Sequence, residues 1–165
     1  MIARRFEDLI VWQLVHQLQQ EVFAFTAKLP ASKDYKYCDQ IREASRSASW
    51  NTSEGFGRYY PKEFRYFLRI AAASLHEVKN QLQDGRDHGY LTDEERVRLR
   101  RLALRAIKAN VRLSAYLRHA KAPEPFWREQ APREPQEHRE TRERREPRES
   151  QEPREPQEPQ EPREP

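Results

Sequence analysis

The clearest chemistry-bearing pattern in the 165-residue sequence is a row of cations spaced by three and four residues. Its members are Arg98, Arg101, Arg105, Lys108 and Arg112. On a helix, which turns by about 100° per residue, this spacing puts all five on one face roughly 80° wide and about 21 Å long. No Asp or Glu occurs between residues 96 and 122, so the row has no acidic partner within its own helix. Such a row suits contact with nucleic-acid phosphates, and the alternative is a solvated outer face paired with acids of a neighbouring helix.

Three further arginines are predicted to add to an anion-binding surface: Arg42, Arg46 and Arg58. Arg42 and Arg46 share one helix face because they are four residues apart. Residues 1–122 carry 22 Lys and Arg against 14 Asp and Glu, a net charge of +8, whereas residues 123–165 carry 9 against 13. The positive excess of the first segment favours RNA or DNA as a partner.

Patterns that could support catalysis or cofactor binding are incomplete. His76 and Glu77 begin like the zinc-binding H-E-x-x-H motif, but residue 80 is Asn. Gly55 and Gly57 form a G-x-G that follows a predicted helix and lacks the third glycine of a dinucleotide-binding loop. We therefore expect a non-enzymatic protein with no catalytic residue, no metal site and no cofactor.

Cysteine content and hydropathy narrow the class of protein further. Cys38 is the only cysteine, which excludes an intramolecular disulfide framework and a cysteine zinc cluster. No stretch approaches the roughly 18 uninterrupted apolar residues of a membrane span. Glu7 and Asp8 stand where a signal peptide would begin its apolar segment. We expect a cytoplasmic protein without a membrane partner.

Four segments with helical periodicity must position these residues, and none shows the alternation of a strand. They are predicted over residues 6–28, 35–54, from 61 to the glycines at 85 and 89, and 92–120. Pro61 suits a first helical turn, Thr92 with Glu95 forms a capping box, and Gly55 and Gly57 are predicted to end the second helix. In the last helix the inward residues are expected to be Leu99, Leu102, Ala106, Leu113 and Tyr116. Long helices with short loops predict an all-α, antiparallel up-down four-helix bundle over residues 1–122.

The C-terminal segment differs in composition from the predicted bundle. Residues 123–165 consist largely of Pro, Glu, Arg and Gln in repeated Q-E-P and R-E-P triplets. Proline at every third position forbids a regular helix, and there is little apolar surface to bury. We predict a disordered tail, which could shield the basic bundle electrostatically.

Aromatic residues are more numerous than one small bundle core can bury. Phe23 falls beside the apolar stripe of the first helix, and Trp50 lies in the polar second helix. Such residues either cover loops or form a subunit interface, where aromatics are enriched. We favour the interface and therefore homo-oligomerisation.

Several motifs together resemble one protein family. The run from Phe6 to His16 resembles an F-x-D-L-x-V-W-Q-x-x-H opening, and Asn51 to Arg58 resembles N-I-A-E-G-F-G-R. These are motifs of the four-helix-bundle proteins encoded in intervening sequences of bacterial large-subunit ribosomal RNA genes. The resemblance continues through residues 62–90 and covers about residues 5–120, leaving the tail outside.

The resemblance implies a bundle that assembles into a ring, typically a homopentamer. Relatives of this family include the accessory proteins of diversity-generating retroelements, which bind nucleic acid and a reverse transcriptase. No catalytic residue is implied, and Arg58 is a potential ligand contact. Positions that the motifs or the aromatic pattern indicate as fold- or interface-defining are Trp12, His16, Phe23, Trp50, Asn51, Glu54, Gly55, Phe56, Gly57 and Glu77.

Two functions stay open on the sequence. The first is an RNA- or DNA-associated accessory factor that contacts phosphates through basic helix faces. The second is a structural or adaptor oligomer with protein partners, in which the basic row is merely solvated.

Overall fold

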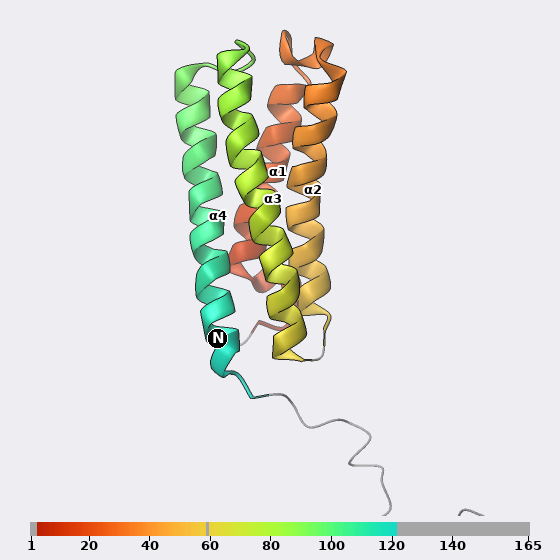
Figure 1. Ribbon diagram of the computed structural model, residues 1–165, viewed down its shortest axis with the longest axis vertical. Helices are drawn as coiled ribbons and strands as arrows, with labels where there is room; N and C mark the ends of the chain where they lie inside the picture. Colours follow the sequence, from red (N-terminus) through yellow and green to blue (C-terminus); the bar gives the residue numbers. More distant parts are fainter. Residues whose placement is uncertain (1–2, 59, 122–165) are drawn as a thin grey trace, which may run out of the picture. The chain divides into compact units, whose positions relative to one another are not determined.

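Four long helices form the folded part of the chain, which a computed structural model describes for residues 3–58 and 60–121. They are α1 (Ile10–Thr26), α2 (Tyr35–Phe56), α3 (Pro61–Asp87) and α4 (Asp93–His119), with short 3-10 turns η1 (Phe6–Asp8) and η2 (Ala31–Lys33). They pack side by side, each contacting the next, and α4 also contacts α1 (Figure 1). The predicted all-α four-helix architecture is confirmed. The proposed tail and its boundary after residue 122 lie outside the described residues.

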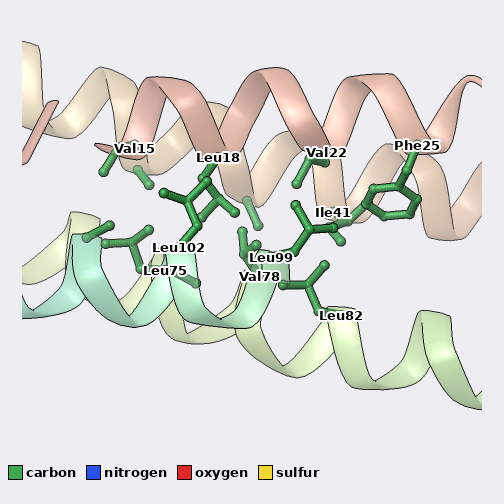
Figure 2. Close-up of a cluster of buried hydrophobic side chains, with 14 of the residues drawn as sticks. Val15, Leu18, Val22, Phe25, Ile41, Leu75, Val78, Leu82, Leu99 and Leu102 are labelled. Atoms are coloured by element: carbon green, nitrogen blue, oxygen red, sulfur yellow. The ribbon is translucent and has the colours of Figure 1, made fainter. Parts of the chain in front are cut away.

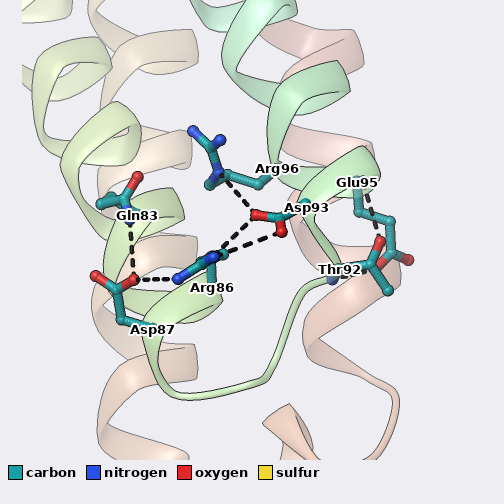
Figure 3. Close-up of polar contacts among 7 residues, drawn as sticks. All are labelled: Gln83, Arg86, Asp87, Thr92, Asp93, Glu95 and Arg96. Atoms are coloured by element: carbon teal, nitrogen blue, oxygen red, sulfur yellow. Dashed lines mark hydrogen bonds and ion pairs between the residues drawn. The ribbon is translucent and has the colours of Figure 1, made fainter.

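Side-chain caps mark the starts of α2 and α4, and a proline marks the start of α3. Asp34 caps α2 by accepting a 3.0 Å hydrogen bond from the Tyr37 amide. Pro61 occupies the first turn of α3, as predicted. The predicted capping box of α4 is present, with Thr92 Oγ1 accepting from the Glu95 amide at 3.2 Å and Glu95 accepting from the Thr92 amide at 2.9 Å (Figure 3).

The core is aliphatic and draws on all four helices. Val15, Leu18 and Val22 of α1 meet Ile41 of α2 and the rows from α3 and α4 in the centre of the bundle (Figure 2). Those rows are Leu75, Val78, Leu82, Leu99 and Leu102, all buried. Burial of each such side chain stabilises the fold by about 1.5–3 kcal/mol.

The prediction that Tyr116 faces inward is wrong, since 71% of this residue is exposed. Ten residues after the buried Ala106, it has rotated about 80° from the core direction. Leu117 occupies the half-buried position instead. The C-terminal end of α4 therefore presents a tyrosine to solvent.

Gly55 and Gly57 are both predicted to end α2, but the structure gives each a different role. Gly55 is buried inside the last turn of α2, where an added Cβ would lie 2.6 Å from the Phe64 ring and 2.8 Å from Phe67 Cβ. Gly57 caps the helix with φ −71°, so it does not use the left-handed conformation. Gly55 thus permits close approach of α3, and Gly57 marks the helix end.

The junction between α3 and α4 is tied by charged side chains. Arg86 Nε donates to Asp93 Oδ1 at 2.9 Å, and Arg86 also pairs with Asp87 at 3.3 Å (Figure 3). The hydrogen bond from Arg86 lowers the pKa of Asp93.

Among the described residues, no helix combines the length and apolarity needed to cross a membrane.

Candidate nucleic-acid interface

The predicted row of cations lies on the solvent side of α4. Arg98, Arg101, Arg105, Lys108 and Arg112 are all exposed, whereas Leu99, Leu102 and Ala106 of the same helix are buried. Successive members are separated by one helical turn, so the row follows the helix axis. The structure therefore brings these five residues together on one surface, which we call the α4 row.

One member of the α4 row has an acidic partner on a neighbouring helix. Arg98 Nη1 donates to Glu21 Oε1 of α1 at 2.7 Å, and this hydrogen bond lowers the pKa of Glu21 and raises that of Arg98. Within the described part of the chain, the other four members form no ion pair. If the face were merely solvated, we would expect its cations to pair with acids of a neighbouring helix. Arg98 does so, and among the described residues the other four members do not.

Arg42 and Arg46 lie in a different place from the α4 row. Their guanidinium groups sit 5.3 and 4.8 Å from the ring centroid of Phe23, between α1 and α2. Arg42 Nε also donates to Thr26 Oγ1 at 2.8 Å, and Arg46 pairs with Glu43 at 3.7 Å. Both arginines therefore contact α1 from α2, and neither belongs to the α4 row. Phe23, predicted at a subunit interface, is half-buried beneath them.

Arg58 belongs to a series of contacts between charged and aromatic side chains. It forms an ion pair with Glu54, and its guanidinium lies 4.7 Å from the centroid of the Phe67 ring. Phe67 meets Tyr66 edge to face at 5.5 Å, and Arg69 lies 5.5 Å from the Tyr66 ring. These contacts hold Arg58, which lies between the end of α2 and the start of α3, against the first turns of α3.

The remaining motif residues fix local structure. Trp12 stacks on His16 at 4.7 Å, and Phe6 meets Trp12 edge-on at 5.1 Å. Asn51 donates to the Ser47 carbonyl at 2.7 Å, and Glu77 accepts from Gln81 at 3.3 Å. Phe56 packs on Phe64 at 6.2 Å. Trp50 stands apart because 58% of it is exposed on α2.

A second basic cluster, which sequence reasoning missed, lies where α3 begins and α4 ends. It comprises Lys62, Arg65 and Arg69 of α3 with Arg118 of α4, and the described residues supply no ion pair to any of the four. The spacing of three and four within α3 was a readable signal. Glu63 interrupts the run of positive charges in the sequence of α3. Arg118 joins the cluster only because the end of α4 packs beside the start of α3.

Nothing in the described residues assembles a metal-binding group of three His, Cys, Asp or Glu side chains. Cys38 is buried, and its thiol donates to the Ala31 carbonyl at 3.1 Å. Burial raises the pKa of this thiol, which disfavours the reactive thiolate. Cys38 is therefore a structural residue.

The fold and the α4 row together define a four-helix bundle with a cationic outer face. The chain belongs to the 23S rRNA-intervening sequence protein family, whose model matches residues 7–111. The matched segment includes the opening motif from Glu7 onward, the Asn51–Arg58 motif and the α4 row as far as Lys108. Arg112 follows directly after it. No curated protein matches the chain significantly.

Proposed function

We propose that this protein is a non-enzymatic, homo-oligomeric accessory factor that associates with RNA or DNA by contacting phosphates through the α4 row. The observation that carries the proposal is that Arg101, Arg105, Lys108 and Arg112 are exposed on one face without an ion pair among the described residues. Unpaired surface cations are free to replace the counterions around a phosphate backbone. The family, which is that of proteins of ribosomal RNA intervening sequences, supports RNA as the partner.

Reversing charge on the α4 row tests this function. Replacing Arg101, Arg105 and Arg112 with Glu should abolish oligonucleotide binding at low salt, because three phosphate contacts become repulsive. Neutralising the same three residues with Gln should lower the slope of log affinity against log salt by about 2–3. Filter binding over a salt series measures both effects.

A matched control reverses three exposed cations away from the α4 row. Lys28, Lys33 and Lys36 lie exposed around the α1–α2 connection, and changing them to Glu alters the net charge equally. This control should keep most of the affinity. Equal loss in both triple variants, or none in the α4 variant, would contradict binding through the α4 row. Crosslinking in cells would then identify the bound RNA directly.

The second candidate is a structural or adaptor oligomer with protein partners. Exposed apolar side chains at seven-residue intervals favour it: Val97, Leu104 and Val111 are 44%, 38% and 59% exposed on α4. Such a line suits packing against another protein helix. If the protein associates with a reverse transcriptase, we propose that it does so through this apolar line of α4.

Self-association is common to both candidates, and we propose a ring such as a homopentamer with Trp50 at the subunit contact. Trp50→Arg should shift the mass measured by light scattering towards the monomer, because a buried interface tryptophan typically contributes about 2 kcal/mol or more. Tyr35→Arg, at a more exposed aromatic position of α2 (82% against 58% for Trp50), is the control and should leave the mass unchanged. A wild-type monomer at micromolar concentration would refute the ring.

A further inference from the structure

The outer face of the first turns of α3 alternates cations with a tyrosine. Lys62 precedes Tyr66 by four residues, and Arg69 follows it by three, so the three side chains lie along one helix face. Lys62 and Arg69 make no ion pair with any described residue. An aromatic ring flanked by unpaired cations is the arrangement with which proteins hold unpaired nucleotides.

Arg65 completes this surface from the side that faces α4. Its Nε atom is buried and has no hydrogen-bond partner, although a guanidinium N–H removed from water is costly to leave unpaired. Arg65 and Lys62 line a hollow between the start of α3 and the end of α4, and Arg118 lines it from α4. Glu63 contributes the only negative charge among the described lining residues. Lys62, Arg65 and Arg118 thus bring three cations to one hollow, which suits an oxyanion.

The Tyr66 ring is both accessible and held in place. Tyr66 is 52% exposed, and two neighbours orient its ring: Phe67 in edge-to-face contact at 88°, and the Arg69 guanidinium 5.5 Å from the ring centroid. Phe67 is itself covered by Arg58. A ring that is fixed before binding loses little conformational freedom when a planar ligand stacks on it.

We propose that this α3 surface binds an unpaired nucleotide, with its base stacked on Tyr66 and its phosphates held by Lys62, Arg65, Arg69 and Arg118. The proposal rests on the nucleic-acid function above and makes it specific: the partner is single-stranded. In a duplex the bases are stacked on one another and cannot lie against Tyr66, whereas the α4 row contacts phosphates of either form. The two surfaces therefore have separable roles.

Fluorescence anisotropy with the full chain tests the proposal, using a labelled uridine oligonucleotide and a duplex of equal length. Tyr66→Ala should weaken binding of the single strand about tenfold, which is the usual effect of removing one stacked base contact, and leave duplex binding unchanged. Tyr66→Phe should bind like the wild type. Tyr66→Leu keeps apolar bulk against Phe67 but lacks the ring, so it should lose affinity as Tyr66→Ala does.

Tyr35→Ala is the matched control, because Tyr35 is an exposed tyrosine at the start of α2, outside both this surface and the α4 row, and it should bind like the wild type. If Tyr66→Ala and Tyr66→Leu bind the single strand normally while the α4 charge reversal abolishes binding, the nucleotide site is overturned and the proposed function stands. Equal losses for single strand and duplex on Tyr66→Ala also overturn it. Absence of binding to either nucleic acid at low salt overturns the proposed function itself.

Discussion

Single residues decide how closely α2 and α3 pack. Gly55 faces the side chains of Phe64 and Phe67, and the Cβ of Phe67 is fixed to the α3 backbone. A larger residue at position 55 would therefore have to displace the helix, because side-chain rotation cannot move that atom. The glycine is thus required by interhelical distance.

Gly55→Ala should destabilise the fold by about 1–2 kcal/mol. Overpacking a well-filled contact costs about 1–3 kcal/mol, and the gain in helix propensity on replacing glycine offsets up to about 1 kcal/mol of it. Gly57→Ala is the control, because an added Cβ there would lie 3.4 Å from its nearest neighbour and φ is −71°. Urea denaturation should place the midpoint of Gly55→Ala below the wild type and that of Gly57→Ala at or above it. Equal midpoints for the two variants would contradict the close-approach role.

At the scale of elements, the cap of α2 also joins two parts of the bundle. Asp34 accepts from the Tyr37 amide and, through Oδ2, from the Tyr90 hydroxyl at 2.8 Å. Tyr90 lies in the α3–α4 connection and packs on Tyr37 at 5.0 Å. One carboxylate therefore links the start of α2 to a segment 56 residues away.

Stability should depend on pH through this carboxylate. The Tyr37 amide and then the Tyr90 hydroxyl lower the pKa of Asp34 from its usual value of 3.8. A group with a depressed folded-state pKa stabilises the fold fully above its unfolded pKa and loses this contribution as pH falls through the folded pKa. Asp34→Asn should therefore be less stable than the wild type at pH near 7, and the difference should shrink on acidification below about 4.

Urea midpoints measured from neutral pH to about pH 3 follow this change across the range of carboxyl titration. Asp39→Asn removes an exposed acid of the same helix for which no described hydrogen bond exists, and serves as the control. A stability difference between Asp34→Asn and wild type that stays constant with pH would contradict the role of the charge.

The elements were predictable from sequence because their signals are local. Periodicity gave the four helices, and Pro61 and Thr92 marked starts that the structure confirms. The contact between the Arg42 guanidinium and the Phe23 ring depends on how α1 and α2 are aligned. Hydrophobic periodicity gives no information about that alignment. The α3 surface depends in the same way on Arg118 approaching from another helix. The α4 row was found because all its members lie within one helix, so helical geometry alone could assemble it.

At the scale of the whole molecule, charge is divided between two segments of opposite sign. Residues 1–122 carry the net charge of +8 and the α4 row, and residues 123–165 carry 13 Glu against 9 Arg. Electrostatic attraction acts over about 10 Å at 0.1 M salt. An acidic segment in the same chain therefore lowers the average positive potential that an approaching nucleic acid meets.

Removing residues 123–165 should raise affinity for oligonucleotides severalfold at low salt, since the competing carboxylates are lost. The gain should disappear near 1 M salt, where the screening length falls to about 3 Å. Filter binding with the full chain and the truncated chain measures the change. A full-length variant with four of the 13 Glu of the segment replaced by Gln balances its nine Arg. It separates net charge from chain length and should behave like the truncation. Equal affinity of all three proteins at low salt would show that the acidic segment does not modulate binding, and the charge of the bundle alone would then set the affinity.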